Sequence, residues 1–122
     1  MSSAAQAYAR TAQTTASPRD IEAQALLKAA NKLQDVMTNL GRTDDEFAEA
    51  LLFNRKLWAI LLSAVTSEEN PQSIEIRQNI ANIGTFVMTQ TMELQLNPQR
   101  EKLKSLIDIN CNLAAGLSGR AA

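Results

Sequence analysis

The sequence predicts an all-α fold, a single-domain four-helix bundle, and three observations carry this prediction. Apolar residues recur at steps of three and four along most of the chain, as they do on one face of a helix. Residues of high helix propensity dominate, whereas runs of β-branched residues are short. Four helix-start signals divide the 122 residues into segments of ordinary helical length. One domain of this size buries a core without disulfides or metals.

The N-terminal 16 residues consist mainly of Ala, Ser, Thr and Gln, with Tyr8 as their one large apolar anchor and Arg10 as their one charge. Two interpretations stay open: a frayed terminus, or a short extra helix that docks through Tyr8. The domain organisation that we predict is a flexible or short helical arm over 1–16, a helical bundle over 17–119, and a tail over 120–122.

The first helix is expected to begin at Ser17-Pro18 and to stop at Gly41. Ser17 caps the free amides, Pro18 occupies the first turn, and Asp20 complements the positive end of the helix dipole. Gly41 supplies the helix stop. The expected core stripe comprises Leu26, Ala29, Leu33, Val36, Met37 and Leu40.

The sequence Thr43-Asp44-Asp45-Glu46 has the pattern of a capping box and predicts the start of the second helix. Asn54 falls inside its apolar stripe, and we weigh a satisfied buried amide equally against a boundary position. The other members of this stripe are Phe47, Ala50, Leu51, Leu57, Trp58, Leu61, Leu62 and Val65.

The third and fourth helices are each expected to open at an Asn-Pro pair, at Asn70-Pro71 and at Asn97-Pro98. The third should run from about Pro71 to Leu96, and the fourth should end near Gly116 and Gly119. The third carries a core stripe of Ile76, Ile80, Ile83, Val87, Thr91 and Leu94. The stripe of the fourth is Leu103, Leu106, Ile107, Cys111, Leu113 and Leu117.

The composition lacks the residue types that most often form a catalytic or metal centre. We therefore predict that the protein is not an enzyme and binds no cofactor and no metal. The chain has no histidine and a single cysteine, Cys111, which we interpret as a small core residue. The carboxylates at Asp44-Asp45-Glu46 and Glu68-Glu69 read as helix caps and solvated surface. A net charge of −1 argues against nucleic-acid and membrane-surface binding. With no secretory or membrane-spanning segment, we expect a cytoplasmic protein.

The third helix carries more apolar surface than one face holds. Ile74, Ala81, Met88 and Met92 form a second stripe, and Phe86 widens the first. A central helix packed on both sides explains this pattern, and so does a groove for a partner helix in which the flexible methionines adapt to apolar surfaces. In the second case Gly84 would permit close approach of the partner. The second helix shows a similar excess at Leu52, Phe53, Ile60 and Ala64.

Five short stretches of the chain stand in a characteristic order: Ala7-Tyr8, Ser17–Glu22, Asn54–Trp58, Leu106–Asn110 and Leu113–Leu117. In this order and spacing the chain resembles the FlaF family of flagellar biosynthesis regulators. The stretches are individually short but together span almost the whole chain. The family supplies no catalytic residues to carry over.

The resemblance implies a factor that binds flagellin as a chaperone or regulator and supports flagellin synthesis and secretion for filament assembly. The alternative is a post-transcriptional regulator that acts with FlbT on translation of flagellin mRNA. Flagellin is therefore the expected partner and FlbT a second candidate, with the oligomeric state left open. Arg55, Asp108 and Asn110 are the polar positions selected for partner contact, beside the apolar candidates Ile74, Met88, Met92, Phe86 and Phe53.

Overall fold

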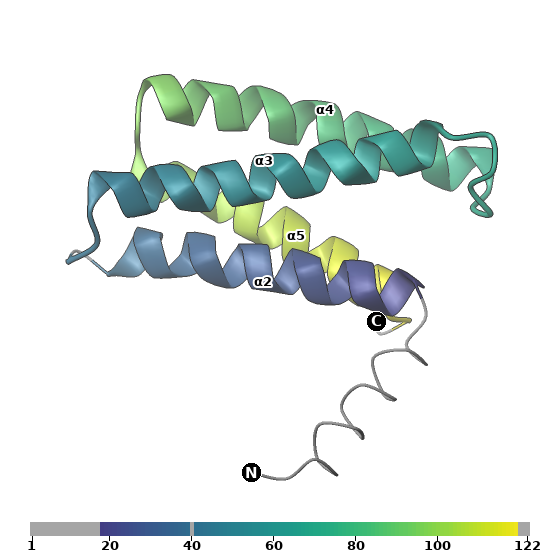
Figure 1. The fold of residues 1–122 in the computed structure, drawn as a ribbon, viewed down its shortest axis with the longest axis horizontal. Coiled ribbons are helices and arrows are strands. Elements are labelled where there is room, and N and C mark those ends of the chain that lie inside the picture. Colours follow the sequence, from purple (N-terminus) through teal and green to yellow (C-terminus); the bar gives the residue numbers. More distant parts are fainter. Residues whose placement is uncertain (1–17, 40, 120–122) are drawn as a thin grey trace, which may run out of the picture.

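The computed structural model describes residues 18–39 and 41–119. Within them the chain forms four α-helices and one short 3₁₀ turn, which confirms the predicted all-α four-helix architecture (Figure 1). The expected arm with Tyr8, the Ser17 cap, Leu40 and the tail lie outside the described residues. The elements are α2 (Pro18–Thr38), α3 (Asp44–Thr66), α4 (Ile74–Leu96), η1 (Arg100–Lys102) and α5 (Leu103–Leu117).

The predicted capping box at the start of α3 is confirmed. The Glu46 amide donates to Thr43 Oγ1 at 3.1 Å, and the Thr43 amide donates to the Glu46 carboxylate at 3.1 Å. These hydrogen bonds lower the pKa of Glu46, and the Arg42 guanidinium acts in the same direction. Both interactions are local in sequence, which is why the sequence alone located this helix end.

The predicted start of α4 at Asn70-Pro71 is wrong, because α4 begins at Ile74 with Ser73 as its cap. Ser73 Oγ accepts a hydrogen bond from the Ile76 amide at 3.2 Å. Asn70 instead closes the preceding helix: its side-chain amide donates to the Ala64 carbonyl, and its oxygen accepts from the Gln72 amide. An Asn-Pro pair therefore serves here as a turn.

The last helix also begins later than Asn97-Pro98 suggests. A 3₁₀ turn at Arg100–Lys102 comes first, and α5 proper starts at Leu103. The Arg100 guanidinium explains why this turn is held in place, since it donates to the carbonyl oxygens of Asn39 and Arg42 at 3.1 and 3.2 Å. This side chain ties the α4–α5 connection to the α2–α3 connection.

The helices pack as an incompletely closed bundle. Close backbone contacts join α2 to α5, α2 to α3 and α3 to α4, whereas α4 and α5 make almost none. Figure 1 shows the reason: α5 runs diagonally, from beneath α3 and α4 at its start to the N-terminal end of α2 at its finish. The bundle is therefore closed on three sides and open between α4 and α5.

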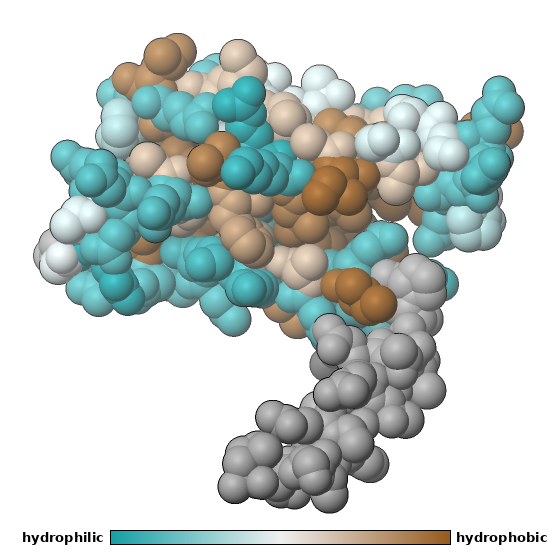
Figure 2. Space-filling view, viewed as in Figure 1, coloured by the Kyte–Doolittle hydropathy of each residue, from teal (hydrophilic) through white to brown (hydrophobic). Residues whose placement is uncertain are grey.

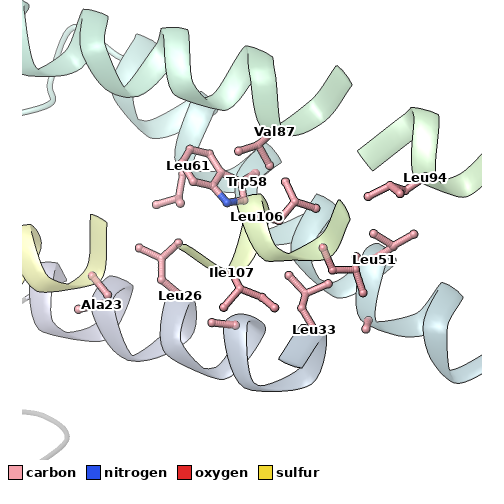
Figure 3. Packing of buried hydrophobic residues seen from close by; sticks show 14 of the residues in the cluster. Ala23, Leu26, Leu33, Leu51, Trp58, Leu61, Val87, Leu94, Leu106 and Ile107 are labelled. Carbon is pink, nitrogen blue, oxygen red and sulfur yellow. The ribbon is translucent and has the colours of Figure 1, made fainter. Parts of the chain in front are cut away.

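The core lies around Trp58, which is fully buried as predicted. Figure 3 shows its ring among Leu61, Val87 and Leu106, so that one aromatic side chain contacts α4 and α5 from α3. With so few aromatic residues in the chain, most of the remaining core is aliphatic. Burying each large aliphatic side chain contributes roughly 1.5–3 kcal/mol.

A buried amide network crosses this core. The Trp58 indole N–H donates to Asn110 Oδ1 at 3.0 Å, and Asn110 Nδ2 donates to Asn54 Oδ1 at 2.7 Å and to the Leu26 carbonyl at 3.4 Å. Asn54 is fully buried, so the boundary alternative for this residue is wrong. Its amide nitrogen has no partner among the described residues. The network links α2, α3 and α5.

The buried face of α4 differs from the predicted stripe. Ile76 and Ile83 were expected in the core, yet both are exposed. Gly84 is buried against α3 instead. A Cβ at this position would overlap the Leu62 side chain and lie 3.2 Å from the Trp58 ring. Its missing side chain lets α4 lie close to α3 and turns the isoleucines outward. The buried positions are Ile80, Gly84, Val87, Thr91 and Leu94.

Candidate functional site

The open side of the bundle forms an apolar groove, named here the α4–α5 groove. It has a volume of about 580 Å³. Ile83 and Phe86 of α4 are 37% and 48% exposed along it, which leaves two large apolar side chains facing solvent on adjacent turns. The groove is lined by Asn82, Ile83, Phe86, Ile109, Asn112 and Leu113.

Helical spacing places these side chains. Ile83 and Phe86 lie three positions apart on α4, and Ile109 and Leu113 lie four apart on α5, so each pair shares one helix face. Ile109 and Leu113 are half-buried and pack against the core, which makes them the base of the groove. Asn82 and Asn112 supply exposed amide groups at its edges.

The helix segments that form the groove carry no charge. Residues 78–92 of α4 and 109–117 of α5 contain no Asp, Glu, Lys or Arg. Residues 57–66 of α3 are also free of them. A surface of this kind attracts no partner by long-range electrostatics, but it buries apolar area without the cost of desolvating ions.

The α4–α5 groove continues into a recess at the end of the bundle where α2 begins. Leu113 lines both, and the recess has a volume of about 170 Å³. Arg19 and Glu22 of the first turns of α2 form one side of it, while Leu61, Val65, Ile80 and Leu117 are among its apolar lining. Burial raises the pKa of Glu22, and the nearby Arg19 opposes this shift. Figure 2 shows apolar residues gathered between α3 and α2 on this side of the molecule.

The apolar candidates from the sequence do not form one site. Phe86 lies in the α4–α5 groove, but Ile74 and Met92, 79% and 56% exposed, lie on another side of α4. These two residues are 18 positions apart, which is about 27 Å along a helix. Met88 packs against the core and is only partly exposed. The surplus of exposed apolar side chains is therefore present, but a methionine groove is not.

The remaining surface candidates are scattered as well. Phe53 is half-buried beneath two lysines of α2, with the Lys28 and Lys32 ammonium groups 5.6 and 5.1 Å from its ring centroid. Asp108 is exposed and pairs with Lys104 of its own helix at 2.9 Å. Arg55 is exposed on α3. None of these side chains lines the α4–α5 groove.

The selection of Asn110 for partner contact is wrong. Its side chain has no exposed surface, because it lies on the face of α5 that meets Trp58, Asn54 and the backbone of α2. Its hydrogen bonds are needed inside the protein, since a buried amide without them would cost about 1–3 kcal/mol per unsatisfied group. Asn110 is a core residue of the described fold.

The sequence interpretation missed the groove because Ile83 and Leu113 were assigned to core stripes, and Ile109 was assigned to no apolar stripe. One signal in the sequence could have indicated the groove: α4 and α5 each contain a long segment without charged residues. No group of three or more His, Cys, Asp or Glu side chains is placed to bind a metal within the part of the chain that the structure describes. Over 18–39 and 41–119, every helix is too short or too polar to cross a membrane.

The fold and the site together define a small all-α bundle protein with an exposed, uncharged apolar groove. A family model described as flagellar protein FlaF matches residues 4–117. The match covers nearly the whole chain, and the protein belongs to the FlaF family, which confirms the resemblance seen in the sequence. Comparison with curated proteins and with solved structures found no match.

Proposed function

We propose that this protein binds an amphipathic helix of flagellin in the α4–α5 groove and thereby supports flagellin synthesis and secretion. The observation that carries the proposal is the open side of the bundle, where Ile83 and Phe86 are exposed above Ile109 and Leu113. Membership of a flagellar protein family supports a partner from the flagellum. Its place of action is the cytoplasm, before flagellin is exported.

A helix is the occupant that this geometry favours. The groove runs between two helices that already belong to one bundle, so a further helix would pack against both of them as a regular bundle neighbour. Helix-in-groove recognition uses apolar residues at helical spacing, and the spacing of Ile83, Phe86, Ile109 and Leu113 is complementary to such a ligand. The exposed amides of Asn82 and Asn112 offer hydrogen bonds at the rim.

The protein acts by binding and not by catalysis in this proposal. A chain without histidine lacks the commonest general base, and the lining of the α4–α5 groove holds no carboxylate. Covering an apolar helix before export would prevent it from aggregating, which is a function that needs affinity alone.

The test is titration of purified flagellin with the double variant Ile83→Asp, Phe86→Asp. Two carboxylates in the groove should weaken binding by more than tenfold, because charge would be buried without a partner. The matched control is Leu52→Asp with Ile60→Asp, which places the same charges on exposed apolar residues of α3 outside the groove. This control should bind flagellin like the parent protein.

Equal loss in both double variants would show that charge, and not the groove, governs binding. Unchanged binding by the folded groove variant would place the flagellin site elsewhere. Repeating the titration with FlbT present separates the alternative function: capture that occurs only with FlbT would favour a regulator that acts on flagellin mRNA translation.

A further inference from the structure

The chain that precedes α2 enters the molecule at the end of the α4–α5 groove. α2 begins at Pro18, and the next turns contribute Arg19 and Glu22 to the recess that adjoins the groove. The described part of the chain therefore begins beside the apolar surface.

The arm has the length that the groove needs. Tyr8 stands ten positions before Pro18, which is about 15 Å along a helix. Ten positions back along α5 from Leu117 is Ile107, also about 15 Å, so a helical arm that runs beside α5 would bring Tyr8 level with Ile107, about 3 Å along the helix axis from Ile109. An extended arm reaches twice as far, so reach does not limit this placement.

The chemistry of the arm also fits. Arg10 is the one charge in residues 1–16, just as the facing segments of α4 and α5 are uncharged. Ala5, Tyr8 and Ala12 recur at steps of three and four, which puts one ring between two small residues on a single helix face. Alanine has the highest helix propensity and lets helices approach closely. The family match begins at residue 4, so the arm belongs to the pattern that defines the family.

We propose that residues 1–16 of this chain dock as a helix in the α4–α5 groove, with Tyr8 between Phe86 and Ile109, and cover it until a partner helix displaces them. The docking stands on the groove and the arm alone, whereas the displacement rests on the function proposed above. The arm then acts as an intramolecular competitor that weakens flagellin binding and shields apolar surface in the free protein.

Disulfide trapping in the full chain tests the docking. In a Cys111→Ala background, Tyr8→Cys is combined with Ile83→Cys, and the matched control combines Tyr8→Cys with Thr85→Cys. Positions 83 and 85 are both exposed and at the same level of α4, but they lie about 200° apart around the helix. The 8–83 pair should close within one molecule at least tenfold faster than the 8–85 pair, because a disulfide needs Cα atoms within about 7 Å.

Equal rates for the two pairs, or disulfides that form only between molecules, would overturn the docking. If Ile83→Cys fails to fold, Asn82→Cys replaces it, because this polar groove residue is exposed and contributes nothing to the core. Circular dichroism establishes folding before each trapping experiment.

The competition has its own measurement. Tyr8→Ala should bind purified flagellin three- to tenfold more tightly than the parent chain, because the groove loses its internal occupant. If the 8–83 disulfide forms rapidly but Tyr8→Ala leaves flagellin affinity unchanged, the docking holds and flagellin does not use this groove. If trapping fails while Ile83→Asp with Phe86→Asp abolishes flagellin binding, the proposed function holds and the arm proposal falls.

Discussion

The two long sides of α5 behave differently. On the side that meets α2 and α3, every large residue is buried, and Asn110 pairs with Trp58, Asn54 and the Leu26 carbonyl. On the side that faces α4, Ile109 and Leu113 are covered only in part, and the apolar residues opposite them are exposed. Among the described residues, one helix therefore carries a closely packed contact with α2 on one side and an incompletely covered surface toward α4 on the other.

This difference separates a side of α5 whose packing is specified by hydrogen bonds from a side where apolar surface stays exposed. The hydrogen bonds that Asn110 makes with Trp58, Asn54 and the Leu26 carbonyl define one arrangement of α2, α3 and α5. The amides that line the α4–α5 groove, Asn82 and Asn112, are exposed, so under the proposed function different apolar helices would be accommodated there at small cost.

The largest effect is expected for Val87→Asp compared with Phe86→Asp. The two residues are neighbours on α4, but Val87 is fully buried against Trp58 whereas Phe86 faces the groove. A carboxylate at position 87 would be buried without a partner and should cost more than about 4 kcal/mol of unfolding free energy. At position 86 the change should stay within about 1 kcal/mol. Urea denaturation followed by circular dichroism measures both.

A similar loss of unfolding free energy in both variants would mean that Phe86 is part of the core. The two sides of α5 would then not differ in the way described above. Ile83→Asp is a second test on the groove side. Its change in unfolding free energy should be similar to that of Phe86→Asp, since both side chains line the same groove.

The next effect is expected for Asn110→Ala, which removes the centre of the buried network. The Trp58 indole N–H and Asn54 Oδ1 would both lose their partners, so the unfolding free energy should fall by about 3 kcal/mol. Asn112→Ala, two positions along α5 on the exposed surface, is the matched control and should change stability by less than about 0.5 kcal/mol. A loss below 1 kcal/mol for Asn110→Ala would show that the network does not hold α5 in place.

The fold was predictable because its signals are local. The capping box at Thr43 and Glu46 involves residues three positions apart, and the apolar periodicity of α2 and α5 needs no knowledge of neighbouring helices. The start of α4 was misplaced because Asn70 and Ser73 both have the chemistry of a cap. Only the structure shows that Asn70 closes α3 instead.

The candidate site was predictable from the sequence only as a surplus of apolar residues on α4. The sequence shows that α4 carries surplus apolar residues, and Phe86 was correctly among them. Which face is left open depends on the diagonal path of α5 and on the depth at which Gly84 lets α4 pack on α3, and neither is encoded in a local pattern. Asn110 was misjudged for the same reason, since its partners lie on two other helices.

The smallest effect separates the two glycines that lie within helices. Gly84→Ala gains about 1 kcal/mol of helix propensity, but the new methyl group would overlap Leu62 and crowd Trp58, so a net loss of about 1–2 kcal/mol is expected. Gly116→Ala meets no atom within 4 Å and should gain about 0.5–1 kcal/mol. If urea denaturation shows a loss of unfolding free energy for Gly84→Ala and a gain for Gly116→Ala, Gly84 is required for close packing of α4 on α3. If both variants gained stability, α4 would have room to rotate, Ile83 could turn inward, and the exposure of the α4–α5 groove would no longer be fixed by the packing of α3.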